Sequence, residues 1–227
     1  MILEWDINKE YGFLDILPRE YDEAYFKKYE EYAKTPMGNK LTEERISFVN
    51  KWCHPGDNCN SLLDIGVGSG CFIKRRNQLA REVAPGIKSP SSLGYDINPV
   101  AVEMLKRDGL YVDIAKEESL IFSAYTFWDS FEHIKDHSGL FNKMYSGYFN
   151  DLPVKAKVFM SIPIFRGVEH ALGSKHFRVN EHYWYFTAQG LIRYMSDRGF
   201  ACLGVDDFEN RFRAGREDIL SFVFGKR

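Results

Sequence analysis

The segment from Leu62 to Gly70 (LLDIGVGSG) constrains the fold of this chain more than any other stretch. An apolar run over 61–65 leads directly into three glycines at alternate positions, and a helical pattern follows over 71–83. Glycine lets the main chain adopt conformations that are closed to other residues, and it lets the chain approach a ligand closely. The segment therefore predicts a buried strand, a tight turn and a helix whose N-terminus lies at the end of a sheet, where α/β proteins bind ligands.

Predicted strands and helices alternate along the rest of the chain. Further strands are expected at 93–97, 110–114, 124–128, 157–162, 200–205 and 219–224, and helices at 99–108, 137–148 and 188–198. This alternation predicts a mainly parallel sheet with helices on both faces. Only a glycine- and charge-rich loop joins the last two strands, so they are expected to pair as an antiparallel hairpin. The sequence thus predicts an α/β fold with a seven-stranded sheet.

Residues 1–40 predict a small helical cap. Apolar and aromatic residues recur at three- and four-residue spacing over 20–34, which indicates a surface helix. Pro36 and Gly38 are expected to end it, and Thr42 is expected to cap a second helix that runs to about Trp52. We therefore expect two units, an N-terminal helical cap over 1–40 and a main domain over 41–227.

Acidic residues stand at the ends of the first three predicted strands: Asp64, Asp96 and Asp113. An acid at the tip of the second strand can accept hydrogen bonds from both hydroxyls of a ribose, and one on the third could contact an adenine amino group. Asp64 would repel a pyrophosphate but suits a positive amino group, and Cys71 stands where the dinucleotide fingerprint needs glycine or alanine. The pattern favours S-adenosylmethionine over a nicotinamide cofactor. Each acid taken alone could also be a turn or cap residue.

Two longer segments resemble a known family. LLDIGVGSG (62–70) followed by GYDINPVAVEML (94–105) resembles motif I and the acidic post-I segment of class I S-adenosylmethionine-dependent methyltransferases. TFWDSFEHI (126–134) resembles the D-x-x-E-H segment of the broad group that contains the ubiquinone-pathway O-methyltransferases. The resemblance covers about 41–226 and implies a Rossmann-like fold with S-adenosylmethionine as the cofactor. It implies that Asp64, Gly66, Gly68 and Gly70 hold the methionine part, that Asp96 binds the ribose, that Ile97 and Asp113 flank the adenine, and that Trp128 and Asp129 lie beside the sulfonium.

Asp129, Glu132 and His133 are the first candidates for the chemistry. Methyl transfer is an in-line displacement in which the protein orients two reactants and removes a proton from a hydroxyl or ammonium acceptor. The three residues would share one face if a helix begins at residue 129. That face could present His133 as a general base near neutral pH. It could also hold a divalent metal, as the similar segment is thought to do in ubiquinone-pathway enzymes, although we do not favour a metal. The alternative is that Glu132 and His133 only cap and pair within the helix.

A second polar cluster runs from Ser174 to Phe186 (SKHFRVNEHYWYF). It is too polar for a simple core strand, and its aromatic and cationic side chains suit a planar or anionic acceptor. His176 and His182 are therefore second candidates for the base. The alternative is a loop that packs its aromatic residues onto the sheet and leaves its ions in water.

Composition limits the partners of the chain. The net charge of −2 does not favour a nucleic-acid binder, and the segment WDSF (128–131) lacks the prolines of amino-group DNA methylation. We expect methyl transfer to a small-molecule acceptor, at oxygen or nitrogen. A nucleic-acid base or tRNA methyltransferase is the alternative within the class. A NAD-dependent oxidoreductase or a non-catalytic nucleotide-binding protein is the alternative outside it.

The sequence also bears on location and assembly. It shows no stretch long enough to span a membrane and no signal-peptide pattern at residue 1. Its four cysteines are too scattered for a disulfide framework. A reduced, cytoplasmic protein is therefore expected, and no feature of the sequence specifies an oligomeric state.

Overall fold

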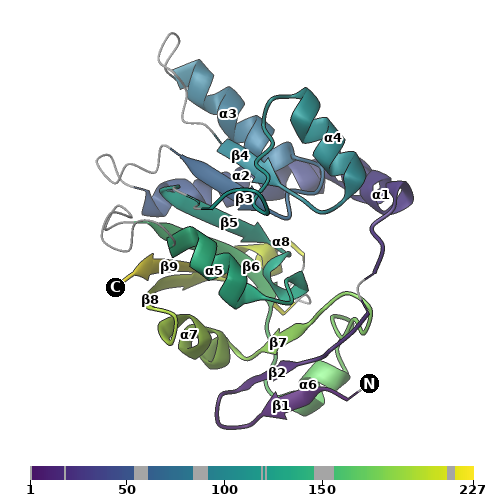
Figure 1. The fold of residues 1–227 in the computed structure, drawn as a ribbon, viewed down its shortest axis with the longest axis vertical. Helices are drawn as coiled ribbons and strands as arrows, with labels where there is room; N and C mark the ends of the chain where they lie inside the picture. The colour runs from purple at the N-terminus through teal and green to yellow at the C-terminus, as the bar shows by residue number, and fades with distance from the viewer. Residues whose placement is uncertain are drawn as a thin grey trace.

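The computed structural model describes residues 2–17, 19–53, 61–83, 92–118, 120, 122–145, 156–213 and 218–227. Its central sheet has six strands in the order β4-β3-β5-β6-β9-β8 (Figure 1). The strands β3 (Leu62–Ile65), β4 (Ser92–Tyr95), β5 (Ala124–Trp128) and β6 (Lys157–Pro163) are parallel, and β9 (Ile219–Lys226) runs antiparallel to both β6 and β8 (Phe200–Asp206). The predicted α/β fold with a C-terminal hairpin is confirmed.

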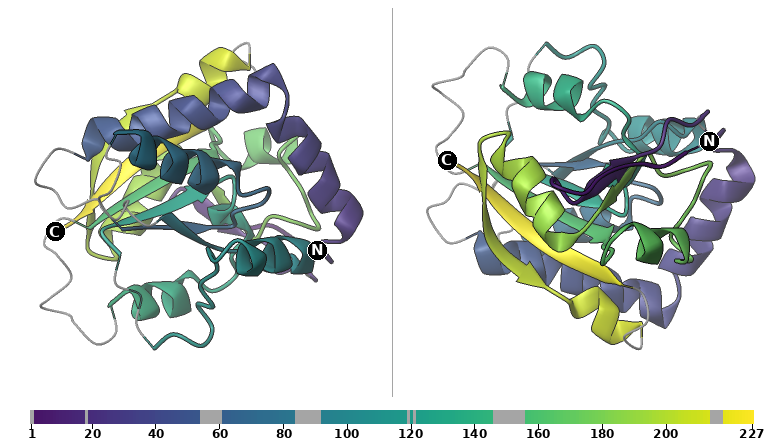
Figure 2. Two further views of the ribbon diagram at one scale, coloured as in Figure 1. Left: turned by 90° about the horizontal axis from the view of Figure 1, so that it is seen from above. Right: turned by 90° about the horizontal axis from the view of Figure 1, so that it is seen from below.

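Helices cover both faces of this sheet, as Figure 2 shows. The cause is the alternation of side chains along each strand, which supplies two separate buried cores. Leu63 and Tyr125 pack on the face covered by α5 (His137–Tyr145) and α7 (Ala188–Ser196). Leu62 and Ala124 pack on the opposite face, which is covered by α2 (Pro36–Trp52), α3 (Cys71–Val83), α4 (Pro99–Arg107) and α8 (Phe208–Phe212).

The strand expected at 110–114 is reduced to a single β-bridge between Tyr111 and Gly94. Two hydrogen bonds hold it, from Gly94 N to Leu110 O and from Val112 N to Gly94 O. The chain then turns away, because the carboxylate of Asp113 accepts a hydrogen bond from Ala115 N at 3.2 Å. The described sheet therefore has six strands where seven were expected, and the missing strand is the one predicted at 110–114.

A second, three-stranded sheet lies beside the first. It consists of β1 (Glu4–Asp6), β2 (Tyr11–Phe13) and β7 (Trp184–Phe186), and it packs with α6 (Val168–Leu172) around a small core of its own. These strands were not predicted from the sequence, because each has only three residues, too few to show an alternating pattern. The first 40 residues thus contain a hairpin in addition to helix α1 (Glu23–Ala33).

Two helix boundaries differ from expectation. Helix α2 begins at Pro36, with the Thr35 side chain accepting a hydrogen bond from Gly38 N, so Thr42 is not its cap. Proline at the first helical position loses nothing, because its missing N–H would have no partner there. Helix α2 therefore crosses residue 40, and the division into 1–40 and 41–227 stays a prediction. Helix α8 lies between β8 and β9, where only a loop was expected.

Among the described residues, none of the helices combines the length and the apolar character that a membrane crossing requires. Cys71 and Cys202 are free thiols, and Cys59 lies outside the described residues.

Candidate functional site

The glycine turn after β3 has the backbone that its sequence requires. Gly66, Gly68 and Gly70 all have positive φ, at 81°, 53° and 73°. A Cβ on Gly66 would lie 2.4 Å from the Cβ of Ser130, so this position admits no side chain. A Cβ on Gly68 would meet nothing within 4 Å. The main chain of the turn is thus fixed against Ser130 on one side and open beside Gly68.

Asp96 joins the end of β4 to this turn. One of its carboxylate oxygens accepts a hydrogen bond from Gly68 N at 2.8 Å, and the other accepts one from Asn98 N at 2.8 Å. Burial raises the pKa of Asp96 above its usual value. The next side chain, Ile97, is 64% exposed, an unusual position for a large apolar group. An acid and an exposed apolar surface therefore stand side by side next to the glycine turn.

Asp113 follows the Tyr111 bridge, but its carboxylate is engaged locally. It pairs with Lys116 Nζ at 3.2 Å in addition to its hydrogen bond from Ala115 N. Burial alone would raise its pKa, and the partners bring that pKa below the usual value.

Asp64 is buried at the end of β3. Its carboxylate accepts a hydrogen bond from the Thr126 hydroxyl at 2.6 Å. Burial raises the pKa of Asp64 to about 7, although Thr126 and the nearby Arg45 act in the opposite direction. Asp64 thus titrates close to physiological pH.

Trp128 ends strand β5 and Asp129 follows it, and both contact Arg45 of α2. The Arg45 guanidinium lies 5.1 Å from the ring centroid of Trp128 and donates to the Asp129 carboxylate at 2.7 Å. Asp129 adopts a positive φ of 53°, which is uncommon for a residue with a side chain. Burial alone would raise the pKa of Asp129, but Arg45 and Arg213 hold it below the usual value.

This arrangement corrects one expectation. Glu132 and His133 lie in the short 3-10 turn η1 (Phe131–His133), and Asp129 lies outside that turn and bonds to Arg45 instead. The shared helical face of Asp129, Glu132 and His133 is therefore not formed. No motif marked Arg45, whose side chain also donates to the fully buried Glu209 of α8 at 2.8 Å.

The candidates for the chemistry nevertheless meet in space. One side-chain atom from each of Glu132, His133 and His182 lies within 4.8 Å of the other two. His182 Nε2 is 4.0 Å from Glu132 Oε1, and Glu132 Oε2 is buried without a hydrogen-bond partner among the described residues. His176 is also buried, and it lies close enough to Asp129 and His182 to influence the pKa of each.

Burial decides the charge of this cluster. It raises the pKa of Glu132 well above its usual value, lowers that of His133 to about 4 and lowers that of His182 well below its usual value. Near neutral pH the two imidazoles are therefore uncharged, and burial favours the protonated form of Glu132. Such a group can take up a proton from a bound molecule, and its ligand types would also suit a divalent cation.

The cluster is tied to the glycine turn through Ser130. The Ser130 hydroxyl donates to the carbonyl oxygen of Ile65 at 2.5 Å, and Gly66 packs against the Ser130 side chain. The acid-histidine cluster and the glycine turn thus lie at the same edge of the sheet, where β3 and β5 end.

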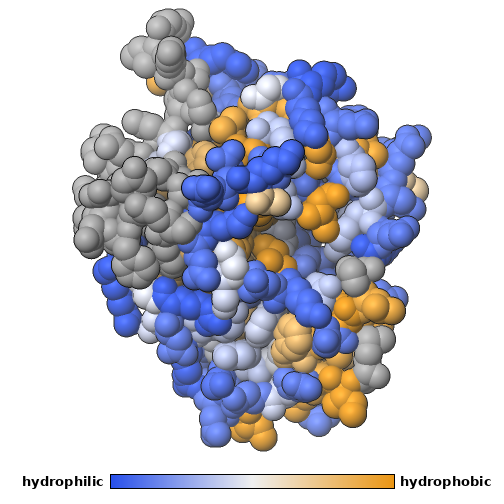
Figure 3. All heavy atoms as spheres, viewed as in Figure 1, coloured by the Kyte–Doolittle hydropathy of each residue, from blue (hydrophilic) through white to orange (hydrophobic). Residues whose placement is uncertain are grey.

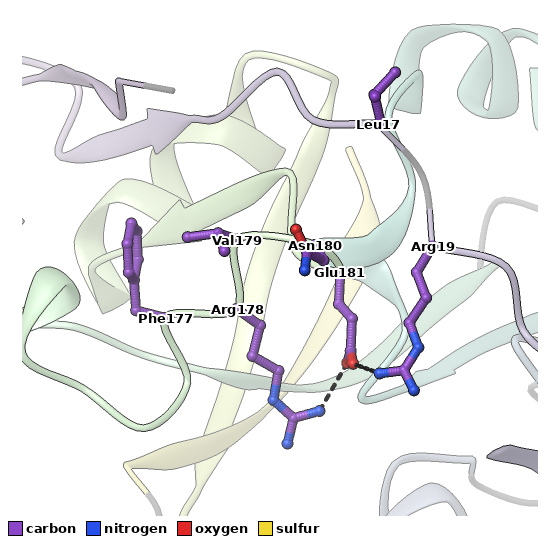
Figure 4. Close-up of a pocket in the computed structure, with 7 residues that line it drawn as sticks. All are labelled: Leu17, Arg19, Phe177, Arg178, Val179, Asn180 and Glu181. Atoms are coloured by element: carbon purple, nitrogen blue, oxygen red, sulfur yellow. Dashed lines mark hydrogen bonds and ion pairs between the residues drawn. The ribbon is translucent and has the colours of Figure 1, made fainter.

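Tyr21 enters the cluster from the N-terminal segment, and no motif predicted it. Its hydroxyl lies 3.1 Å from Nδ1 of His133. Nearby, the Glu181 carboxylate accepts hydrogen bonds from Arg19 and, at 2.9 Å, from Arg178 (Figure 4). A groove of about 480 Å³ runs here, lined by Leu17, Arg19, Phe177, Arg178, Val179, Asn180 and Glu181.

The sequence matches the model of a family described as a methyltransferase domain over residues 19–205. This chain belongs to that family. The motif at 62–70 and the fold agree with the assignment, and the chain is a class I S-adenosylmethionine-dependent methyltransferase with S-adenosylmethionine as its cofactor. The alternative of a NAD-dependent oxidoreductase is thereby set aside.

Solved structures share the fold at low sequence identity. Magnesium protoporphyrin IX methyltransferase from Synechocystis PCC 6803, with bound S-adenosylhomocysteine, aligns with a TM-score of 0.59 and 13% identity over 91% of this chain and 96% of its own. A methyltransferase from Archaeoglobus fulgidus aligns at 0.56 and 15% over 89% and 100%. Geranyl diphosphate methyltransferase in complex with S-adenosylmethionine aligns at 0.55 and 13% over 96% and 98%. No curated protein matches the sequence of this chain.

Proposed function

We propose that this methyltransferase transfers the methyl group of S-adenosylmethionine to an oxygen or nitrogen atom of a small-molecule acceptor. The observation that carries the proposal is the buried cluster of Glu132, His133 and His182 beside the glycine turn, in which the imidazole of His133 is neutral. Transfer to a hydroxyl or ammonium group releases a proton, and a neutral imidazole near the acceptor can take it. We assign the role of base to His133 first, with His182 and His176 as further candidates and Glu132 as the group that receives or relays the proton.

The cofactor is proposed to lie along the ends of β3, β4 and β5. Asp64 and the three glycines would hold the methionine part, and Asp96, with its oxygens directed to Gly68 N and Asn98 N, would bind the ribose. The exposed Ile97 would pack on the adenine, with Asp113 near its edge. Trp128 and Asp129 would then lie beside the sulfonium, fixed in place by Arg45.

Two features support a small acceptor. The relatives named for magnesium protoporphyrin IX and geranyl diphosphate are methyltransferases of small molecules, as their names state. The net charge of −2 gives little support to the alternative of a nucleic-acid substrate. We retain the cytoplasm as the proposed location.

Calorimetric titration with S-adenosylhomocysteine tests the cofactor assignment. We expect micromolar binding by the wild-type protein, no binding of NAD, and binding at least about tenfold weaker in Asp96→Ala, because two hydrogen bonds from the ribose to a charged group are lost. Asp197→Ala, at the far end of α7, is the matched control and should bind like wild type. A folded wild-type sample that does not bind S-adenosylhomocysteine would contradict the proposal.

A further inference from the structure

The phenol of Tyr21 sits at the centre of the proposed active site. Its hydroxyl is 3.1 Å from Nδ1 of His133, and its ring stacks edge-on against Tyr25 with 4.9 Å between centroids. Burial raises the pKa of Tyr21 well above its usual value, so the hydroxyl keeps its proton near neutral pH. The chain's own side chain thus occupies the ring nitrogen that a general base would offer to an acceptor.

The Tyr21 hydroxyl lies among the acidic groups that we assign to the cofactor site and to the acid-histidine cluster. The carboxyl groups of Glu181, Asp96 and Glu132 all lie close enough to raise the pKa of Tyr21. Asp96 belongs to the proposed ribose site, and Glu132 belongs to the acid-histidine cluster. A group that receives a methyl from the cofactor and loses a proton to the cluster has to reach both. Tyr21 contacts the cluster at His133, and the carbonyl oxygen of the next residue, Asp22, accepts a hydrogen bond from Asn98, two residues after Asp96.

The segment that carries Tyr21 is anchored at its start, where Leu14 and Ile16 are buried and Leu14 N donates to Tyr183 O at 2.8 Å. Its described residues between β2 and α1 form no helix or strand, and in Figure 1 it runs past the side of the sheet toward which β5 points. It is fastened by the Asn98 side chain, which donates to Asp22 O at 3.2 Å, and by Arg19, which donates to Glu181. Glu181 keeps Arg178 as a partner when Arg19 leaves.

The groove in Figure 4 lies where this segment meets residues 177–181. Leu17 and Arg19 line one side of it, and 177–181 line the other. Leu17 is 89% exposed, and Figure 3 shows apolar side chains gathered on the part of the surface over the small sheet and α6. Withdrawal of 19–22, with the buried Leu14 and Ile16 left in place, would therefore open the groove.

We infer that Tyr21 stands in the place of the acceptor, and that the acceptor is a phenol whose ring and hydroxyl replace those of Tyr21 when the segment withdraws. The inference rests on the proposed function. In the reaction, the phenolic oxygen attacks the methyl carbon, the carbon–sulfur bond breaks and a carbon–oxygen bond forms. The hydroxyl proton passes to Nδ1 of His133, and sulfur leaves as the neutral thioether of S-adenosylhomocysteine.

Removal of the Tyr21 ring provides the test. Tyr21→Gly leaves a space of the size and shape of p-cresol, which is the tyrosine side chain as a free molecule, and Tyr21→Ala leaves that space less one methyl group. With methyl-labelled S-adenosylmethionine, we expect Tyr21→Gly to convert p-cresol to 4-methylanisole at least about tenfold faster than wild type, in which the ring blocks the site. Toluene, which lacks the hydroxyl, should bind more weakly in the presence of S-adenosylhomocysteine.

Tyr32→Ala is the matched control, because Tyr32 lies on the same N-terminal segment of the chain, in α1, and is 40% exposed. It should behave as wild type. If Tyr21→Gly and Tyr32→Ala bind S-adenosylhomocysteine like wild type and methylate p-cresol at the same rate, the inference is overturned while the proposed function stands. Failure of every folded form to bind S-adenosylhomocysteine would overturn both.

A second measurement uses the wild-type protein and does not depend on the folding of a variant. Saturating p-cresol together with S-adenosylhomocysteine should displace the segment and expose the peptide bond after Arg19 to trypsin. We expect cleavage there to become several-fold faster than with toluene. Equal rates with the two compounds would contradict displacement of Tyr21 by a phenol.

Discussion

Burial destabilises the ionised form of Asp64 in the free protein, and the ammonium group of the proposed ligand would stabilise that form. Its carboxyl group, with an ordinary pKa of 3.8, is raised to about 7 by burial. The proton is therefore held more tightly in the folded than in the unfolded chain. The stability that this proton contributes is present below pH 3.8 and is lost as the pH rises to about 7. A ligand ammonium group needs the carboxylate form, so binding must remove the proton near neutral pH.

We therefore predict that affinity for S-adenosylhomocysteine rises about tenfold between pH 6 and pH 8, because the fraction of free protein with an ionised Asp64 rises by that factor. Calorimetry across this range, in two buffers of different ionisation enthalpy, would detect the released proton. Asp64→Asn should bind more weakly and with little dependence on pH. Asp113→Asn is the control: the pKa of Asp113 is already low, so the wild-type slope should remain. A flat wild-type profile would argue against Asp64 as the partner of the ammonium group.

Some residues of the proposed site could be predicted from the sequence, and others could not. Asp64, Gly68 and Asp96 were predictable because a strand, a glycine turn and the next strand tip place them by local order alone. Tyr21 and Arg45 were not, because their partners His133 and Asp129 stand 112 and 84 residues further along the chain. Only the folded chain brings such pairs together. A tyrosine in a loop or an arginine in a helix has no sequence feature that reveals its distant partner.

At the scale of elements, local periodicity was sufficient for α3 and α4, whose limits follow the pattern of apolar residues and the proline at 99. It failed where pairing is long-range. Strand β2 finds its partner in β7, and neither has the length to show an alternating pattern. The helix expected to begin at Asp129 is also absent. Asp129 has a positive φ, and only the short turn η1 follows it.

Helix α8 shows how an unexpected element is anchored. Its Glu209 is fully buried and accepts hydrogen bonds from Arg45 of α2 at 2.8 Å and from Arg213 at 3.2 Å. Glu209→Gln removes the negative charge and leaves two cations with Asp129 alone, so we predict a loss of about 3 kcal/mol in the free energy of unfolding. Urea denaturation followed by tryptophan fluorescence would measure it.

Asp207→Asn provides the comparison within the same helix region. Asp207 pairs with Arg211 on the surface, and both side chains are largely exposed, so its loss should change stability by no more than about 0.5 kcal/mol. If the two variants were equally stable, the buried ion cluster would not be what fastens α8 to α2.

At the scale of the whole molecule, two sheets lie around the proposed site. The large sheet provides the glycine turn and the acids, and the segment that leads into β7 of the small sheet provides His176 and His182. The sheets touch where Phe165 N donates to Phe186 O, and Tyr183 N donates to Glu132 O beside the cluster. Such a division predicts that the cofactor and the acceptor stabilise different parts of the protein.

Hydrogen exchange measured by mass spectrometry tests this division. A ligand slows the local openings of the segments that it contacts, and at a hundred times its dissociation constant the slowing reaches about a hundredfold. S-adenosylhomocysteine should therefore protect 64–70 and 94–98 strongly and 176–186 little, and NAD at the same concentration should protect neither. In Tyr21→Gly, later addition of p-cresol should extend protection to 178–183 and to η1. Protection by S-adenosylhomocysteine confined to 176–186 would place the cofactor on the small sheet and reverse the assignment of the two halves.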